Sequence, residues 1–213
     1  MGYLYTLIRS MAQGLINTLS IFTITLILSI PLGVFLSLMQ TSKLKVLDKI
    51  CKVYVLIMRG TPLLLQLTFI FFGLPLVGIT FNRYTAAIIA FVLNYGAYFG
   101  EIFRGGIESI DKGQFEAAYV LGLSFRRRFK RIILPQVIKV VLPSVANEVI
   151  TLVKDTSLVY VVGIDELLRI GKIASNREAS LVPLIVVGIF YLIFTLLLTK
   201  IFYILEKRYS YYL

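Results

Sequence analysis

SMAQGLINTLSIFTITLILSIPLGVFLSLMQTS, which covers residues 10–42, is a stretch without a charged residue. A helix rises about 1.5 Å per residue and the hydrocarbon core of a bilayer is about 30 Å thick, so roughly 20 apolar residues can cross it. We therefore predict a transmembrane helix at about residues 14–39. Pro31 lies inside this helix, which a membrane helix tolerates because neighbouring helices satisfy the backbone groups that a kink frees.

The composition of the whole chain also indicates a membrane protein. Of its 213 residues, 58% are hydrophobic and only 15% are charged, whereas about 25% of the residues in an ordinary soluble domain are charged. A net charge of +11 in a soluble protein would favour nucleic acid as a partner. Here the basic residues gather in a few segments between apolar stretches, which the positive-inside rule of membrane proteins explains better. We expect membrane lipid and no nucleic acid around this chain.

Four more apolar segments follow in the chain. They predict transmembrane helices at about residues 53–72, 84–103, 142–164 and 179–199. The second span is interrupted by the sequence RGTP at residues 59–62, so we expect it to be bent or broken. In the third span, Gly96 and Gly100 form a small-residue face that predicts a close helix contact. The predicted fold class is therefore all-α, a polytopic membrane protein with five transmembrane helices in which residues 1–213 form a single domain.

Five spans place the two termini on opposite sides of the membrane. Most of the 22 basic residues fall on one of these sides, in residues 43–52, 104–139 and 200–208. Cytoplasmic loops carry an excess of Lys and Arg. We therefore predict a protein of the bacterial cytoplasmic (inner) membrane, with its N-terminus outside and its C-terminus in the cytoplasm.

The longest predicted cytoplasmic segment, residues 104–139, carries an ordered motif at residues 116–135. Its fixed positions are Glu116, Ala117, Ala118, Gly122, Ile132, Leu134 and Pro135. This spacing resembles the EAA signature of type I ABC importer permeases. Apart from the resemblance, Gly122 permits a sharp turn and Ser124 can cap a second short helix. We therefore expect two short helices that meet at an angle.

The resemblance implies a partner for this segment. In the resembled family, the helical pair docks on a cytoplasmic ATP-binding subunit and couples ATP hydrolysis to transport. The residues that match this coupling role are Glu116, Ala117, Ala118, Gly122, Arg126 and Arg127. A second interpretation stays open, because a basic amphipathic helix also rests on anionic lipid, at about 1 kcal/mol per basic residue.

No catalytic, metal or cofactor site is predicted on the chain itself. It has no Gly-x-x-x-x-Gly-Lys-Ser/Thr motif, so we expect ATP and Mg on the partner and do not expect an enzyme. Cys51 is the single cysteine and histidine is absent, which excludes an intramolecular disulfide and an ordinary zinc site. The resemblance also implies a second permease chain, with a homodimer favoured over a pair of homologous permeases, and an extracytoplasmic substrate-binding protein.

Residues 165–178 are polar, with apolar residues at helical spacing. They predict an outward-facing helix at the membrane surface. Its candidate contacts for the substrate-binding protein are Asp165, Glu166, Arg169 and Lys172. A plain interfacial helix explains these residues equally well.

Three shorter motifs look like the polar amino acid branch of the same family, which takes histidine, arginine, lysine or glutamine. They are RGTPL at residues 59–63, NYGAY at residues 94–98 with Glu101 after it, and KDTSL at residues 154–158. The resemblance implies import of polar amino acids into the cytoplasm by alternating access. An acidic pocket of low dielectric favours a cation, so Glu148 and Asp155 favour cationic L-amino acids.

Ionisable residues at membrane depth cost about 2.5–3.5 kcal/mol each on insertion, and by default they suggest a functional site. The predicted substrate-binding residues are Arg59, Thr61, Asn94, Tyr98, Glu101, Glu148, Asp155 and Thr156. Arg59 suits a substrate carboxylate, while Glu148 and Asp155 share a helical face that suits a cationic group. Tyr98 can instead be packing, and Thr156 can bend its helix without touching substrate.

The charged residues also have structural interpretations. Arg59 can pair with Glu148 or Asp155 to lock spans together. Glu101 can pair with Arg104 at the end of its helix. A secondary carrier driven by an ion gradient is the alternative function, in which these carboxylates would titrate during transport. The absence of an internal inverted repeat argues against it.

Overall fold

The computed structural model describes residues 2–42 and 44–209, and every regular element in these ranges is a helix. In chain order the elements are α1 (Gly2–Gln40), α2 (Lys45–Gly60), α3 (Leu63–Thr68), η1 (Phe69–Gly73), η2 (Leu74–Val77), α4 (Arg83–Glu108), α5 (Lys112–Val120), α6 (Phe125–Arg128), η3 (Phe129–Ile133), α7 (Leu134–Asp155), η4 (Thr156–Val162), α8 (Leu167–Glu178) and α9 (Val182–Tyr209). Lys43, one of the basic residues behind the predicted orientation, lies outside the described residues.

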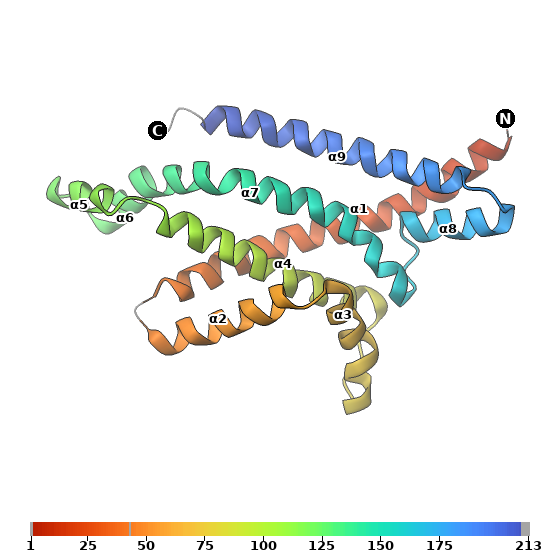
Figure 1. Ribbon diagram of the computed structural model, residues 1–213, viewed down its shortest axis with the longest axis horizontal. Helices are drawn as coiled ribbons and strands as arrows, with labels where there is room; N and C mark the ends of the chain where they lie inside the picture. Colours follow the sequence, from red (N-terminus) through yellow and green to blue (C-terminus); the bar gives the residue numbers. More distant parts are fainter. Residues whose placement is uncertain (1, 43, 210–213) are drawn as a thin grey trace.

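Four long helices, α1, α4, α7 and α9, run along the long axis of the molecule (Figure 1). Each is part of a helical segment long and apolar enough to cross a membrane. The N-terminus and α8 lie at one end of the long axis, whereas the C-terminus, α5 and α6 lie at the other (Figure 1). The two ends of the chain therefore face opposite ends of the bundle, as an odd number of spans requires.

The second predicted span is broken, as the RGTP sequence indicated. α2 and the segment Leu63–Val77 pass the same length and composition test only as a pair, and they are bent by 101°. Counting the pair as one span gives five, and the predicted all-α membrane fold is confirmed. Beyond the bend, α3, η1 and η2 form an arm, residues 63–77, that projects from the side of the bundle (Figure 1).

The helices extend further than the predicted spans. α1 begins at Gly2, and the helix that contains the fourth span begins at Phe125 and continues to Val162. The predicted cytoplasmic segment, residues 104–139, therefore contains the ends of two long helices as well as the expected short ones. Charged residues indicate where a helix leaves the membrane, but they are good helix formers and do not end it.

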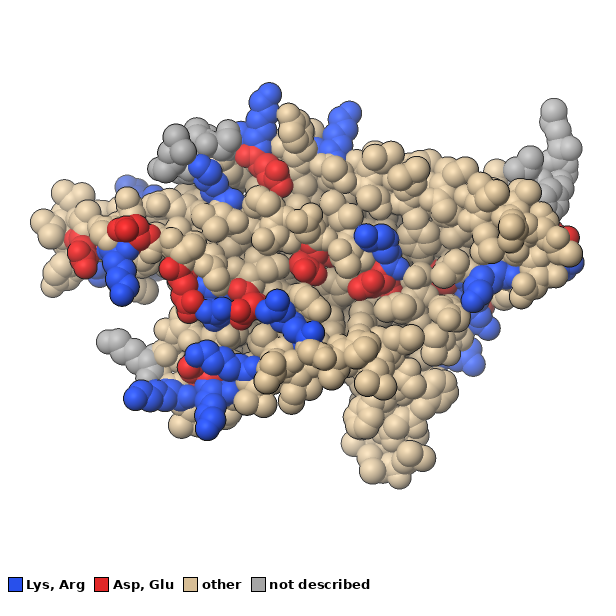
Figure 2. Space-filling model, in the orientation of Figure 1, with Lys and Arg blue, Asp and Glu red and all other residues tan. Residues whose placement is uncertain are grey.

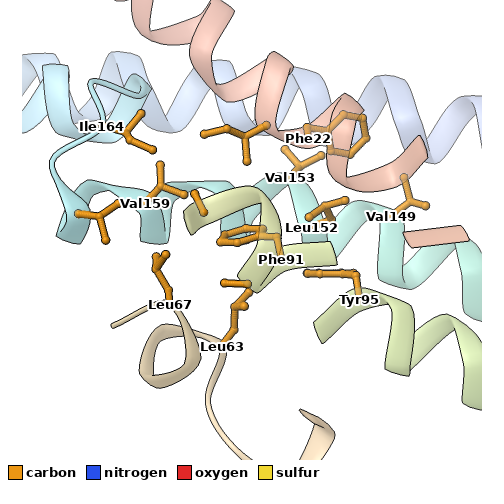
Figure 3. Packing of buried hydrophobic residues seen from close by; sticks show 14 of the residues in the cluster. Phe22, Leu63, Leu67, Phe91, Tyr95, Val149, Leu152, Val153, Val159 and Ile164 are labelled. Atoms are coloured by element: carbon orange, nitrogen blue, oxygen red, sulfur yellow. The ribbon is translucent and has the colours of Figure 1, made fainter. Parts of the chain in front are cut away.

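Helix α4 lies in the middle of the core (Figure 3). Its Phe91 and Tyr95 are buried against Leu67 of α3, Leu152 of α7 and Val159 of η4. Burial of each large side chain contributes about 1.5–3 kcal/mol where the alternative is water, and within lipid the same contacts contribute through close packing instead. The core thus packs α3 and η4 against α4 and against each other.

The contact between α1 and α4 is the most extensive helix pair in the described chain, and small residues permit it. A Cβ on Gly96 would lie 2.5 Å from the Leu32 Cδ2 atom, and a Cβ on Gly100 would lie 3.1 Å from the Leu36 Cβ atom. Both distances are too short for an unshifted side chain. The close helix contact predicted at Gly96 and Gly100 is therefore confirmed.

The outer surface of the bundle is strongly apolar. Helix α9 exposes Ile185, Ile189, Leu192 and Leu196, and a continuous apolar surface of this kind is covered by lipid or by another chain. Figure 2 shows basic and acidic residues along the bundle, while the projecting arm carries none. The arm therefore also requires an apolar environment.

Candidate functional site

The break between α2 and α3 shapes the centre of the molecule. Pro62 has no N–H group and holds the preceding residue extended, and Thr61 has φ −122° and ψ 147°. Helix α2 therefore ends at Gly60, and α3 starts at Leu63 in a new direction. Carbonyl groups in the last turn of α2 lose their helical partners at such a break.

Side-chain amides satisfy these carbonyl groups. The Nε2 group of Gln66 donates to the Met58 carbonyl oxygen at 2.9 Å and to the Thr61 hydroxyl at 2.8 Å. The Nδ2 group of Asn94 donates to the same Met58 oxygen at 2.9 Å and to Gln66 Oε1 at 3.0 Å. The Thr61 hydroxyl donates to the Ile57 carbonyl oxygen at 2.8 Å. Thr61 and Asn94, predicted to bind substrate, therefore use their donors to hold the break.

Gln66 was not among the predicted site residues. It is the single amide in the apolar sequence of the arm, and a lone amide at membrane depth is costly unless it is paired. That signal was present in the sequence. Its partners, however, come from α2 and α4, so its role follows only from the folded arrangement.

A cavity of about 610 Å³ opens beside the break. It is lined by residues of α2, α3, α4, α7 and η4, and its charged groups are Arg59, Glu148 and Asp155. We call it the central cavity. Glu148 and Asp155 lie two turns apart on the same face of α7, as their spacing predicted, and Thr151 lies between them on the wall. The volume is within the range of small-molecule sites.

Asp155 is held in a defined orientation. Its Oδ2 atom accepts a hydrogen bond of 2.7 Å from the hydroxyl of Tyr95, which is only 1% exposed. Its neighbour Thr156 does not line the cavity, contrary to the prediction. Thr156 is fully buried, and its hydroxyl donates to the Val153 carbonyl oxygen at 2.6 Å.

Arg59 faces α4. Its guanidinium carbon lies 5.2 Å from the centre of the Tyr98 ring, and its Nη1 atom lies 3.9 Å from Glu101 Oε1. Neither Glu148 nor Asp155 forms an ion pair with it within the described residues. The Tyr98 ring thus lines the central cavity and also forms a cation–π contact with Arg59.

Glu101 belongs to an ion-pair cluster on α4. Arg104 donates from Nε to Glu101 Oε2 at 3.0 Å, and its Nη groups bond Glu101 Oε1 and Glu108. The pairing of Glu101 with Arg104, one of the two interpretations from the sequence, is present. Glu101 does not line the central cavity but a second one of about 530 Å³, together with Arg59, Tyr98 and Arg104.

The motif at residues 116–135 forms a hairpin of α5, α6 and the start of α7 at one end of the bundle (Figure 1). Gly122 has φ +68° and joins the two helices, a conformation that favours glycine. Ser124 occupies the N-cap position of α6 but makes no side-chain cap hydrogen bond, contrary to expectation. Glu116 and Ala117 are exposed, whereas Ala118 is buried.

The hairpin presents an apolar surface flanked by basic residues. Tyr119, Val120, Leu121 and Phe125 are 69–84% exposed. The coupling candidates Arg126 and Arg127 are exposed beside them. An apolar patch of this size with a charged rim is typical of a protein contact.

Helix α8 packs against α1 and α9 at the other end. Glu166, predicted to contact a partner, is fully buried and caps α8 instead. Its carboxylate accepts hydrogen bonds from the backbone N–H groups of Leu168 and Arg169, both at 2.6 Å, and from the Tyr191 hydroxyl at 3.2 Å. Burial raises the pKa of Glu166 above its ordinary value. Because Glu166 is buried as the cap of α8, it cannot also contact a partner protein.

The remaining charged residues of α8 lie on its outer side. Asp165 and Arg169 form an ion pair of 2.9 Å. The ammonium of Lys172 lies 4.6 Å from the centre of the Tyr160 ring. These residues remain accessible to a partner, whereas Glu166 does not.

Long apolar helices around a cavity with a charged lining are typical of a membrane transport protein. Residues 29–211 match the family described as binding-protein-dependent transport system inner membrane component. The chain belongs to this family. It is the membrane-spanning permease subunit of an ABC importer, a transport component that works with an ATPase partner, as the resemblance implied.

Relatives and solved structures agree with this family. The arginine transport system permease protein ArtQ of Bacillus subtilis is 39% identical over 198 residues, covering 92% of this chain and 90% of that protein. The L-cystine transport system permease protein TcyB of the same organism is 37% identical over 202 residues, with 93% and 86% covered. The solved structure of an amino acid ABC transporter with histidines superposes with a TM-score of 0.88 at 33% identity, over 96% of both chains.

Proposed function

We propose that this permease moves polar, preferentially cationic, L-amino acids into the cytoplasm by alternating access. The observation that carries the proposal is the central cavity, where two carboxylates of α7 face the same space as one guanidinium of α2. Relatives named for arginine and for cystine support an amino acid as substrate. The two carboxylates favour a cation among the amino acids, because opposite charges attract strongly at low dielectric.

Each charged group of the cavity has a partner on a cationic amino acid. Arg59 would bind the α-carboxylate through charge-assisted hydrogen bonds. Asp155, oriented by Tyr95, would receive the α-ammonium. Glu148, one turn from Thr151, would receive the cationic side chain. The apolar wall at Leu63 and Leu64 would cover the aliphatic part of the substrate.

Ligand binding to the assembled transporter tests this assignment. We expect Glu148→Gln to weaken arginine binding about 10–100-fold, because a charge-assisted hydrogen bond is lost, and to affect glutamine less. Glu108→Gln, which removes a carboxylate of α4 outside the central cavity, serves as the control. Equal loss for arginine and glutamine would contradict the role of Glu148 in selecting a cationic side chain.

Three partners complete the proposed transporter. The hairpin with Glu116, Gly122 and Arg126 would dock on the ATP-binding subunit, which holds ATP and Mg. The uncharged arm would face a second permease chain, most simply another copy. The outer side of α8, with Asp165 and Lys172, would meet an extracytoplasmic substrate-binding protein. Residues 1–213 act as one transmembrane domain in this arrangement.

The proposed orientation places the N-terminus outside and the hairpin in the cytoplasm. Its support is the excess of basic residues at the hairpin end. In a Cys51→Ser background, Ser124→Cys and Asn176→Cys place single thiols on the hairpin and on α8, where both native residues are exposed. An impermeant thiol reagent added to intact cells should label only the Asn176→Cys protein. Labelling of the Ser124→Cys protein instead would reverse the orientation.

Uptake by reconstituted vesicles tests the energy source. We expect uptake only when the ATP-binding subunit and ATP are present. Uptake by the permease alone, driven by an ion gradient, would contradict an ATP-driven importer and favour the secondary carrier.

A further inference from the structure

Two cavities meet at Arg59. The central cavity and the second cavity share Arg59, Gly60 and Tyr98 as lining residues. The second cavity continues to Gln40 at the end of α1 and to Lys52 of α2. These positions lie toward the end of the bundle that carries the hairpin (Figure 1). The Arg59 side chain therefore lies between the central cavity and the proposed cytoplasmic side.

Arg59 is held there weakly. Its closest carboxylate oxygen, on Glu101, is 3.9 Å away, beyond hydrogen-bond distance. Glu101 itself is held firmly by Arg104 on the same helix. The Arg59 side chain is 41% exposed and rests on the Tyr98 ring. Its guanidinium donors are thus available to a better acceptor.

The second cavity does not have the charge of an anion site. Lys52 is paired with Asp48 at 2.8 Å, and Arg104 is paired with Glu101 and Glu108. Arg59, the third cation of the lining, lies 3.9 Å from Glu101, so the three cations have three carboxylates beside them and the cavity presents no surplus of positive charge. A role in the passage of substrate fits it better than a role in binding an anion.

Open space lies beside Arg59. A Cβ on Gly60 would have no atom within 4 Å, and the helix ends at this residue. The main chain on both sides of Gly60 is held by Gln66, which donates to the Met58 and Thr61 carbonyl oxygens, so rotation about the side-chain bonds of Arg59 would carry the guanidinium from one cavity to the other. By contrast, Glu101 is fixed in the interior of α4.

We propose that Arg59 is a movable gate between the two cavities, tethered to Glu101 at rest and released when the substrate carboxylate binds it. The inference rests on the proposed function, because it needs a substrate with a carboxylate. A carboxylate that forms two hydrogen bonds with the guanidinium outcompetes Glu101, whose charge is shared with Arg104. Substrate occupancy in the central cavity thereby opens the route to the cytoplasmic side.

Leak from vesicles tests the tether. Vesicles that contain the assembled transporter are loaded with labelled arginine, and its ATP-independent loss is followed. We expect Glu101→Gln to increase this leak about fivefold, which is the population change for an ion pair of about 1 kcal/mol. Glu108→Gln is the matched control, because it removes the other carboxylate of Arg104 without touching Arg59. It should leak as the wild type does.

A second variant tests the gate through a different contact of Arg59. Tyr98→Leu removes the ring under Arg59 and should also raise the leak. Thermal unfolding of both variants shows whether they remain folded. Equal leaks from the Glu101→Gln and Glu108→Gln proteins, or a wild-type leak from folded Glu101→Gln and Tyr98→Leu proteins, would overturn the gate.

A carboxylate-free ligand tests the trigger. Agmatine has the cationic side chain of arginine but lacks its carboxylate. We expect arginine to stimulate ATP hydrolysis of the wild-type complex and agmatine to leave it unstimulated. Equal stimulation by both would overturn the trigger. If the wild-type complex took up no amino acid at all, the proposed function would fail, whereas uptake with the wrong leak pattern would refute only the gate.

Discussion

At the scale of the residue, the centre of this permease depends on side-chain amides that donate hydrogen bonds to the backbone carbonyl groups at a helix break. Gln66 and Asn94 converge on the Met58 carbonyl oxygen and on each other. In lipid no water can replace such a partner. The charged residues nearby are then free for a ligand because the amides, and not the charges, stabilise the bend.

Loss of Gln66 should therefore destabilise the protein. We expect Gln66→Leu to lower the free energy of unfolding by about 1–2 kcal/mol, since buried acceptors lose their donor. Thr68→Val, on the same helix, removes only a hydroxyl that bonds the Leu64 carbonyl of its own turn and should cost less than about 0.5 kcal/mol. Thermal unfolding of the purified complex measures both. Equal losses would contradict the role of the amide.

Glu166 should make stability depend on pH. Because burial raises its pKa above the ordinary value, the folded protein binds this proton more tightly than the unfolded chain does. The stabilisation from Glu166 is complete at pH values below the pKa of Glu166 in the unfolded chain. It is lost as the pH rises through the pKa of Glu166 in the folded protein. We expect the melting temperature of the wild type, relative to Glu166→Gln, to fall as pH rises across this window. A difference in melting temperature between the two proteins that stays constant across this window would contradict the role of Glu166.

At the scale of the element, neighbouring glycines of α4 have different surroundings. A Cβ on Gly106 would lie 2.1 Å from the Val141 Cγ1 atom of α7, whereas a Cβ on Gly105 would have no atom within 4 Å. Valine is stiff at χ1 and cannot easily turn away. The contact of α4 with α7 therefore requires a glycine at position 106 but not at position 105.

This difference predicts opposite effects of the same substitution. Gly106→Ala should destabilise the protein by about 1–3 kcal/mol through overpacking. Gly105→Ala should be neutral or stabilise it by about 0.4–1 kcal/mol, because alanine restricts the unfolded chain. Melting temperatures of the two variants provide the comparison. A Gly106→Ala protein as stable as the Gly105→Ala protein would contradict the packing at Val141.

The hairpin turn gives a further prediction. Gly122 has φ +68° but open space around it, so alanine is disfavoured there only by the backbone, by about 1–2 kcal/mol. We expect Gly122→Ala to reduce ATP-driven uptake relative to ATP hydrolysis. Gly122→Asn should retain more coupling, since asparagine tolerates this conformation. Identical ratios of uptake to hydrolysis in both variants would argue against a role of the turn angle.

At the scale of the whole molecule, patterns that are local in the sequence predicted most of the fold. The length of the apolar segments predicted the spans, the RGTP sequence predicted the break, and Gly122 predicted the turn of the hairpin. Each of these features depends on residues close together in the chain. The helices run beyond the predicted spans, since basic residues mark the membrane boundary and not the end of a helix. Pairs distant in sequence, such as Tyr95 with Asp155, follow only from how α4 and α7 pack.

The arm gives a prediction at this scale. It projects from the bundle, and its Leu76 is 87% exposed. If lipid or a second permease chain surrounds the arm, Leu76→Lys should reduce the amount of permease that inserts into the membrane, since a charge at membrane depth costs about 2.5–3.5 kcal/mol. Val120→Lys, on the hairpin, replaces a similarly exposed residue at 84% and should insert normally. Equal insertion of both would mean that water reaches the arm.

The two amides at the bend also constrain how the gene can change. Gln66 Oε1 accepts the hydrogen bond that Asn94 Nδ2 donates, and both amides donate to the Met58 carbonyl oxygen, so replacement of one amide alone leaves the other without one of its partners. A single substitution at either position therefore lowers the stability of the protein. A change of both positions does not, provided that a continuous helix replaces the bend. Among related permeases, the two positions should vary jointly or stay the same.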